Sequence, residues 1–516
     1  GGDSILVFRL VAALRKEGVI CQASQIFQHQ TIASLAFHID QQNFIGEASQ
    51  EEAPEPQIAP VSPIQKWFFE QHFSEPGQWN QGLVLRLTQA LPSQTIHSAL
   101  LCLQRQYAAL RTYFVEQEDG WQQCVHGLDE PTKAIHLAHF NFAFSSTSSE
   151  GKAAMLRVCE QLNTPFQLSQ GPLFRVALVE WHDVELNSDI EPHKQLIFIA
   201  HHLIVDALSW LVIGDQLESL CAAKHTELPS RPSRMANNLD WAERLQKHAL
   251  LLSHKNSSEA KNLPSKLPLD YDVDNIDQEN LVGSEVVLHT ILALELDVTN
   301  EYAILVAALG QVISSWSEQL DTVICVESHG RSSMFPEVDL STSIGWFTTL
   351  NSVTINSELL ALEQIQDVDQ QLVTLLDSGV INSVRNAYHA QEPIKNALVS
   401  LNYFGSVDAQ TNKEASTRLF QAEAITPSHL QHEKNHRPFL LELSIARKSK
   451  NLEITWVYSR NMHHESTIKA LSDDYISNIK RLSESVLSNV TDQSSTLGLS
   501  IDQFDDLLDE LSLFDE

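Results

Sequence analysis

Hydrophobic and polar positions along most of the chain follow two periods, which predict strands and helices in alternation. Apolar runs typical of buried strands occur at 83–87, 173–179, 196–200, 285–289, 322–327 and 452–458. Apolar residues at helical spacing predict long helices over 93–110 and 299–316. Because strands that alternate with amphipathic helices are typical of α/β proteins, we expect two α/β lobes of about 200 residues each.

Stretches without this pattern divide the chain. Residues 46–60 combine Glu and Pro with no basic residue, which predicts a linker. The polar segment 253–284 predicts a connection between an N-lobe, residues 61–252, and a C-lobe, residues 285–490. The lobes are therefore expected to follow one another along the chain.

The segments at the two ends have patterns of their own. Residues 1–45 predict a small helical unit, whose second helix begins after Thr31 as N-cap. Residues 491–516 form an acidic tail in which apolar residues recur at helical spacing. These are Ile501, Phe504, Leu508 and Leu511. A partner for such a tail should offer an apolar groove rimmed by Lys or Arg.

Composition excludes several classes of function. Lys and Arg number 34 against 66 Asp and Glu, which gives a net charge of −32 over 516 residues and disfavours binding to nucleic acid or anionic membranes. No run approaches the ~18 apolar residues of a membrane-spanning helix. Six scattered cysteines and no spacing typical of metal ligands predict a reduced, cytoplasmic compartment and no metal site. The chain has no signal peptide and does not start with Met, which predicts a part of a longer polypeptide.

The first candidate site is Ser4, in Gly1-Gly2-Asp3-Ser4-Ile5 before the first helix. By itself a serine at this place is an N-cap. Together with Ile26-Phe27 and the run from Thr31 to Ala36, the segment resembles the later part of a peptidyl carrier domain. The resemblance implies that Ser4 carries 4′-phosphopantetheine, and a helix N-terminus favours such an attached phosphodiester.

The second candidate site follows the apolar run 196–200, where His201 and His202 stand side by side. Neighbouring residues at a strand end point to opposite faces, so we expect His201 to pack inward and His202 to face a cavity. An isolated His-His pair is usually structural, as we expect for His463-His464. Residues 201–210, His-His-Leu-Ile-Val-Asp-Ala-Leu-Ser-Trp, are nevertheless similar to the signature of condensation and epimerization domains of nonribosomal peptide synthetases.

Two further segments, Pro63 to Phe69 and Leu110 to Phe114, resemble motifs of the same superfamily. This resemblance implies two lobes like chloramphenicol acetyltransferase around a V-shaped cleft, preceded by a partial helical carrier domain. It also implies an ion pair between Arg111 and Asp206 that fixes the turn presenting His202.

Motifs in the second lobe favour epimerization over condensation. Glu327-Ser328-His329-Gly330-Arg331, the segment 339–348 and Leu401-Asn402-Tyr403-Phe404-Gly405 resemble three epimerization motifs in the right order. The sequence departs from that pattern at several positions. These are Ser328, Thr342, Asn351, Ser352 and the glycine-rich motif near Ser378-Gly379.

Epimerization removes the Cα proton of a thioester from one face and returns a proton to the other, so it needs one basic and one acidic group on opposite sides. His202 and Glu327 are the predicted pair; the resemblance favours Glu327 for direct deprotonation, and the order of the two stays open. Asn402, Tyr403 or a helix N-terminus are candidates for stabilising the enolate oxygen.

The sequence therefore predicts an epimerase for an L-aminoacyl or peptidyl thioester on its own carrier domain. The alternatives are a condensation domain that forms peptide bonds and an inactive carrier-docking module. Implied partners are an upstream adenylation domain, a phosphopantetheinyl transferase and a downstream synthetase bound through residues 501–516.

Overall fold

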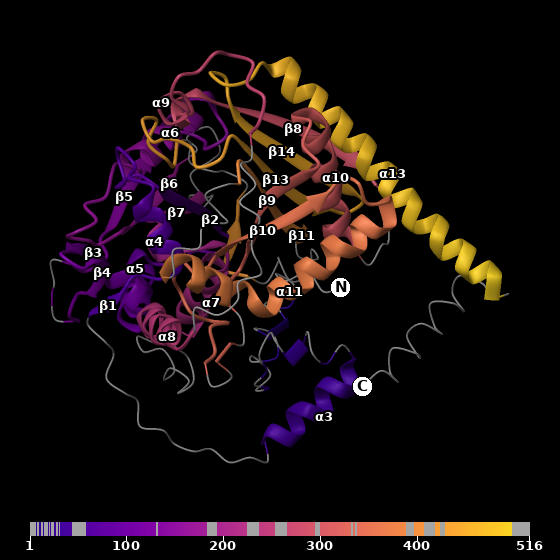
Figure 1. The fold of residues 1–516 in the computed structure, drawn as a ribbon. Helices are drawn as coiled ribbons and strands as arrows, with labels where there is room; N and C mark the ends of the chain where they lie inside the picture. Colours follow the sequence, from indigo (N-terminus) through magenta and orange to yellow (C-terminus); the bar gives the residue numbers. More distant parts are fainter. Residues whose placement is uncertain are drawn as a thin grey trace.

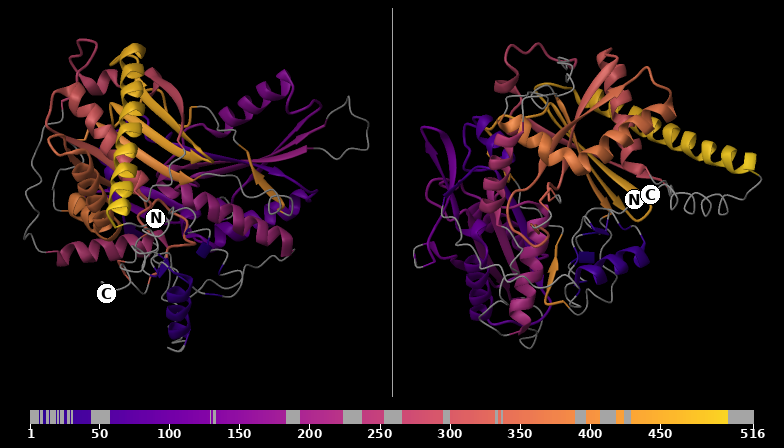
Figure 2. Two further views of the ribbon diagram at one scale, coloured as in Figure 1. Left: turned by 90° about the vertical axis from the view of Figure 1, so that its right-hand side faces the viewer. Right: turned by 60° about the horizontal axis from the view of Figure 1, so that its bottom comes forward.

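The computed structural model describes residues 31–43, 58–128, 130, 133–182, 193–223, 237–252, 266–294, 300–331, 334–335, 338–388, 397–406, 418–423 and 429–497, with nine single positions between Val7 and His29. Two α/β lobes lie side by side, and the helices α4, α8 and α11 pack at their junction (Figure 1). The predicted two-lobed α/β fold is confirmed. Helix α3 (Ile32–Asn43) projects away from both lobes (Figure 2), and Thr31 caps it by accepting a hydrogen bond from the Ser34 N–H.

The N-lobe is built around a five-stranded sheet of order β12-β2-β7-β6-β5. A smaller sheet of order β1-β4-β3 lies in the same lobe. The N-lobe elements, in chain order, are β1 (Ile58–Pro60), α4 (Pro63–Glu70), β2 (Asn80–Leu87), α5 (Ser93–Gln106), η1 (Ala108–Arg111), β3 (Thr112–Gln117), β4 (Gly120–Val125), β5 (Leu137–Phe142), α6 (Ser149–Leu162), β6 (Phe174–Trp181), β7 (His193–His201), η3 (His202–Ile204), α7 (Ala207–Ala223) and α8 (Asn238–Leu251).

The C-lobe is built around a six-stranded sheet of order β10-β9-β11-β13-β14-β8. Helix α13 runs along the outside of this lobe (Figure 1). The elements after α8 are α9 (Ile276–Glu279), η4 (Val282–Ser284), β8 (Glu285–Ala293), α10 (Glu301–Ser317), β9 (Asp321–Ser328), β10 (Thr349–Asn356), α11 (Ala361–Tyr388), β11 (Val399–Ser406), β12 (Phe420–Ala422), β13 (Leu441–Lys448), β14 (Asn451–Ser459) and α13 (Glu465–Leu497).

Two predicted boundaries are wrong. Residues 58–60, expected to end the linker, form β1 and pair with β4. Helix α13 continues to Leu497, past the expected start of the acidic tail at residue 491. The lobes are also not strictly sequential, because β12 leaves the C-terminal half and pairs with β2 of the N-lobe.

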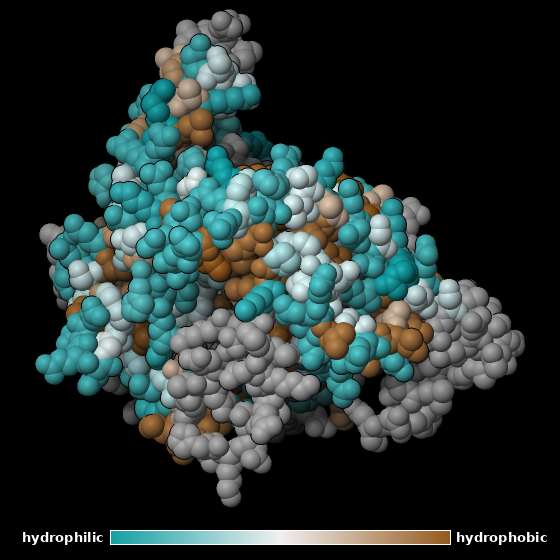
Figure 3. Space-filling view, turned by 45° about the horizontal axis from the view of Figure 1, so that its top comes forward, coloured by the Kyte–Doolittle hydropathy of each residue, from teal (hydrophilic) through white to brown (hydrophobic). Residues whose placement is uncertain are grey.

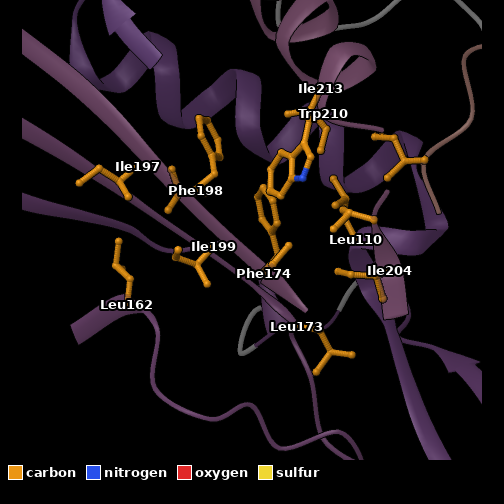
Figure 4. Packing of buried hydrophobic residues seen from close by; sticks show 14 of the residues in the cluster. Leu110, Leu162, Leu173, Phe174, Ile197, Phe198, Ile199, Ile204, Trp210 and Ile213 are labelled. Carbon is orange, nitrogen blue, oxygen red and sulfur yellow. The ribbon is translucent and has the colours of Figure 1, made fainter. Parts of the chain in front are cut away.

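Each sheet contributes to its own apolar core. In the N-lobe, Trp210 of α7 packs beside Phe174 and Phe198 of the sheet, with ring centroids 6.3 and 6.4 Å away (Figure 4). The same cluster reaches across to the C-lobe residues Cys325 and Trp346, so apolar contacts join the lobes. On the face shown in Figure 3, hydrophobic residues gather near the middle between hydrophilic side chains, with further groups toward the edges.

Candidate active site

His201 is the last residue of β7 and lies inside the N-lobe. Its side chain is 0% exposed, its Nε2 lies 2.8 Å from the Pro76 carbonyl oxygen, and its Nδ1 accepts a hydrogen bond from the Leu203 N–H. Burial lowers the pKa of His201 to about 3, so the imidazole is neutral. The prediction that His201 packs inward is confirmed.

His202 points the other way and is partly exposed. Its Nδ1 lies 2.8 Å from the Val205 carbonyl oxygen, and its Nε2 lies 2.9 Å from Nε2 of Gln81. The ring packs against Trp346, with centroids 4.2 Å apart. Burial lowers the pKa of His202, so this group is a neutral imidazole near pH 7.

Glu327 lies near the end of β9, where Leu350 of β10 is its partner across the sheet. The Asn402 amide donates to Oε2 of Glu327 at 2.8 Å and thereby orients the carboxyl group. Burial, with a smaller contribution from Glu442, raises the pKa of Glu327 to about 7. Near neutral pH this carboxyl group therefore exchanges protons readily, as a proton-transfer group must.

Two contacts bring His202 and Glu327 to the same region between the lobes. Trp346, which packs on His202, stands four residues before Leu350, the partner of Glu327. Cys325 is two residues before Glu327, on the same face of β9, and is buried in the N-lobe core. The face that carries Glu327 is therefore turned toward the N-lobe and its histidine motif.

The predicted ion pair between Arg111 and Asp206 is wrong. Oδ1 of Asp206 lies 2.7 Å from a guanidinium nitrogen of Arg331, in the second lobe, and both side chains are almost fully buried. Arg111 lies by the smaller sheet and donates to the carbonyl oxygens of Gln104 and His126. The histidine motif and the Glu327–Arg331 segment are thus held together by an ion pair that crosses between the lobes.

The predicted role of Tyr403 at the enolate oxygen is also wrong. Asn402 and Tyr403 are neighbours on β11, so their side chains point to opposite faces of the sheet. The Tyr403 hydroxyl group donates to Glu301 at the start of α10, and its ring lies beside Tyr302. Asn402, which contacts Glu327, is the one of the two that reaches the site.

Several supporting contacts were not predicted. Ser209 Oγ donates to the Gly345 carbonyl oxygen at 2.9 Å, and the Phe347 N–H donates to Oδ2 of Asp206 at 3.3 Å. These bonds fix the loop that carries Trp346 against the start of α7. The segment 344–348 was recognised as a motif, but only the structure gives it this role; nothing in the sequence singles out Gln81.

Two of the departures from the family pattern, Ser328 and the pair of Asn351 with Gly379, are accommodated locally. A Cβ atom at Gly330, which has a φ of +63°, would lie 1.7 Å from the Phe347 carbonyl oxygen, so this glycine is required. Ser328, by contrast, is tolerated because its hydroxyl group bonds to that of Thr349 at 2.7 Å. A Cβ atom at Gly379 would approach the Asn351 amide to 3.1 Å, so the small residue on α11 makes room for Asn351.

The carrier segment touches the N-lobe within the histidine motif. Val7 and Val11 are 5% and 1% exposed and form a small apolar cluster with Leu208 of α7. Ser4 and the acidic residues 501–516 lie outside the described residues.

Neither a metal site nor a membrane-spanning helix is found among the described residues. Within those ranges, no three His, Cys, Asp or Glu side chains are grouped as metal ligands. No helix in that part of the chain combines the length and apolar character needed to cross a membrane.

Sequence comparisons identify the family. The model of the condensation domain matches residues 55–508, and the model of the phosphopantetheine attachment site matches residues 1–39. The protein belongs to the condensation-domain family, an enzyme family of nonribosomal peptide synthetases, and it carries a phosphopantetheine attachment site.

Curated relatives are much longer than this chain. It is 28% identical over 500 residues to chondramide synthase cmdD of Chondromyces crocatus and 26% identical over 501 residues to tyrocidine synthase 2 of Brevibacillus parabrevis. Each alignment covers 92% of this chain but 12% and 13% of the relative. The chain thus spans only a small part of the relatives' length.

Solved structures share the fold. The epimerization domain from the third module of tyrocidine synthetase B matches with a TM-score of 0.70 and 22% identity, over 85% of this chain and 100% of that chain. The starter condensation domain of rhizomide synthetase matches with a TM-score of 0.57 and 13% identity, over 83% and 97%. At these identities the likeness concerns the fold alone.

Proposed function

We propose that this protein epimerizes an L-aminoacyl or peptidyl thioester, carried on phosphopantetheine at Ser4, to a mixture with its D form. The observation that carries the proposal is the carboxyl group of Glu327, held by Asn402 at 2.8 Å, on the sheet face turned toward His202. A second proton-transfer group opposite the histidine is what inversion at Cα requires. Forming a peptide bond does not need a carboxyl group at this place.

In this mechanism the two groups work on opposite faces of the substrate Cα. When bound, phosphopantetheine supplies the thioester linkage that makes the Cα proton acidic. Glu327 takes the proton from one face as a carboxylate, and His202, after taking up a proton from solvent at Nε2, returns that proton to the other face. Asn402 keeps Glu327 oriented throughout, because its amide contacts the carboxyl group directly.

Heavy water separates this proposal from its alternatives. We expect the protein, loaded with an L-aminoacyl thioester, to incorporate one α-deuterium and release both L and D amino acid, as read by mass spectrometry and chiral chromatography. His202→Ala should do neither. Amide formation with an acceptor thioester in place of exchange would indicate a condensation domain, and no reaction at all would indicate a docking module.

The contact between Val7, Val11 and Leu208 supports delivery of the substrate by the chain's own carrier segment. We expect Leu208→Asp to slow epimerization of the carrier-bound substrate about tenfold, because losing a buried leucine contact costs at least the ~1.4 kcal/mol of a tenfold change. The rate with a small soluble thioester should stay the same, since the variant leaves the proton-transfer groups in place.

Leu211→Asp is the matched control for this docking experiment. Leu211 is on the same helix, is 37% exposed and lies outside the cluster of Val7, Val11 and Leu208. Equal rates for Leu208→Asp and the wild type on the carrier-bound substrate would argue against docking at Leu208.

The remaining partners are part of the same proposal. An upstream adenylation domain would supply the amino acid, and a phosphopantetheinyl transferase would modify Ser4. The acidic segment 501–516 would bind the next synthetase through its apolar residues, with salt weakening the contact by screening its charges.

A further inference from the structure

The side-chain amide of Gln81 forms hydrogen bonds through both its oxygen and its nitrogen. It lies on β2, where it pairs with Ala200 of β7. The indole Nε1 of Trp210 donates to its Oε1 at 2.8 Å, and its Nε2 lies 2.9 Å from Nε2 of His202. Gln81 thus connects a core tryptophan of α7 with the proposed proton-transfer histidine.

The chemistry of these groups determines where the hydrogens are. An indole N–H can only donate, so the amide oxygen of Gln81 must face Trp210 and its NH₂ group must face His202. Because an amide NH₂ only donates, Nε2 of His202 accepts through its lone pair. The Val205 carbonyl oxygen only accepts, so Nδ1 of His202 carries the hydrogen.

We propose that Gln81 is a positioning residue that keeps His202 in the neutral Nδ1–H form in the resting protein and must turn its amide away whenever His202 becomes protonated. A proton on Nε2 would face the NH₂ group, which is a second donor. The inference rests on the proposed function, since it assigns Gln81 control over when His202 carries the proton that it exchanges with the substrate.

Trp210, which holds the amide oxygen of Gln81, is itself fixed by packing. Trp210 is 9% exposed and is held in the N-lobe core beside Phe174 and Phe198 (Figure 4). If the Gln81 amide turned over in place, it would present its NH₂ group to the indole N–H and lose that hydrogen bond. Protonation of His202 is therefore coupled to breaking the bond between Gln81 and Trp210, which disfavours the protonated form.

Other titratable groups around His202 do not replace Gln81. Asp206 favours the protonated form of His202, but its carboxylate is engaged by Arg331 at 2.7 Å. His201 is buried and neutral, and burial lowers the pKa of His329 to about 4. Glu327 is on the opposite lobe. Among these residues, the donor aimed at Nε2 is the amide of Gln81.

The closing experiment reads the tautomer directly, without any catalytic turnover. We would label the histidine rings with ¹⁵N, follow ring ¹H–¹⁵N correlations against pH in the whole chain, and assign His202 among the 22 histidines by subtracting the His202→Ala spectrum. The expected result is a protonated Nδ1 and an unprotonated Nε2. A resting Nε2–H form would overturn the proposal.

Two substitutions test the coupling. Gln81→Glu is nearly isosteric and places an acceptor at Nε2, so we expect the pKa of His202 to rise by about one unit or more, a tenfold gain in proton affinity. Trp210→Phe removes the anchor and should raise the same pKa by a smaller amount. An unchanged pKa in both variants would overturn the proposal.

The chain offers a matched control. Trp181 donates from Nε1 to Oε1 of Gln195 at 2.7 Å in the same sheet, at the end away from His202. Trp181→Phe should therefore leave the His202 signals unchanged; a shift equal to that of Trp210→Phe would count against a specific role for Gln81.

The kinetic readout keeps this inference separate from the proposed function. The pH profile of α-deuterium exchange should have a midpoint that reflects the ionisation of His202. We expect this midpoint to move to higher pH in Gln81→Glu, together with the pKa of His202 measured by NMR. If the wild type shows the expected tautomer but no exchange at any pH, the positioning role holds and the epimerase proposal fails.

Discussion

Glu327→Gln should abolish epimerization while the protein stays folded. The change keeps the size of the side chain and an oxygen for the Asn402 amide, which donates to Oε2 at 2.8 Å, but removes the group that takes up a proton. Loss of a general base costs about 10²–10⁴ in rate, and we expect a decrease of about a thousandfold. Chiral chromatography of the amino acid released from the carrier measures it.

The pH dependence of stability in the same variant is an independent test of the raised pKa of Glu327. Glu327 has a pKa raised from 4.5 to about 7 by burial, so the folded protein holds this proton while the unfolded chain releases it. Below pH 4.5 the carboxyl group is protonated in both states, so its burial has no ionisation cost. As the pH rises from 4.5 to about 7, the unfolded chain gains stability by ionising while the folded protein does not, so the stability of the wild type falls. Glu327→Gln cannot ionise, so its melting temperature relative to the wild type should rise between pH 4.5 and 7.

Glu442→Gln is the control for the activity of Glu327→Gln. Glu442 contributes to the raised pKa of Glu327 from β13, and its carboxylate is bonded to Arg437 at 2.6 Å. The variant should remain active, with the pH profile of epimerization shifted to lower pH. If Glu327→Gln formed near-normal amounts of D product, Glu327 would have no part in proton transfer.

Residues whose role depends on local pattern could be predicted from the sequence. The apolar runs became β2, β6, β7, β8, β9 and β14, because a buried strand needs such a run whatever its partner. His201 and His202 were assigned to opposite faces by the alternation of side chains at the end of β7. Glu327 was singled out because it ends another buried run within a recognisable motif.

Features that depend on distant pairing could not be predicted. Strand β12 has three residues, Phe420–Ala422, and its partner β2 ends more than 300 positions earlier, so no local pattern shows the pairing. Tyr403 follows Asn402 directly, and only the register of β11 against β9 decides which of the two faces Glu327. The hydrogen bonds of Gln81 likewise depend on how β2 lies beside β7.

The predicted partner of Asp206, Arg111, was wrong for a related reason. Two arginines, Arg111 and Arg331, each follow an apolar segment within a recognisable motif, and the sequence contains nothing that measures their distances to Asp206. The resemblance favoured the arginine in the same lobe. The structure pairs Asp206 across the lobes, which changes the meaning of the contact: it supports the placement of Glu327 relative to His202 as well as the turn after β7.

Arg331→Met should destabilise the protein by about 3–5 kcal/mol, since it leaves the buried Asp206 carboxylate without its charged partner. Urea unfolding monitored by tryptophan fluorescence measures the free energy of unfolding. The variant also loses the hydrogen bonds from Arg331 to the Leu340 and Ser343 carbonyl oxygens, so the single substitution alone does not isolate the ion pair.

A double-mutant cycle with Asp206→Asn isolates it. Adding Asp206→Asn to Arg331→Met should cost less than Asp206→Asn costs in the wild type, with a coupling of about 0.5–3 kcal/mol, because the first change has already broken the pair. Arg111→Met is the matched control: it loses bonds to the Gln104 and His126 carbonyl oxygens and should combine additively with Asp206→Asn. Coupling of Asp206 to Arg111 with none to Arg331 would restore the pairing within one lobe, and the link between the two proposed proton-transfer groups would then be absent.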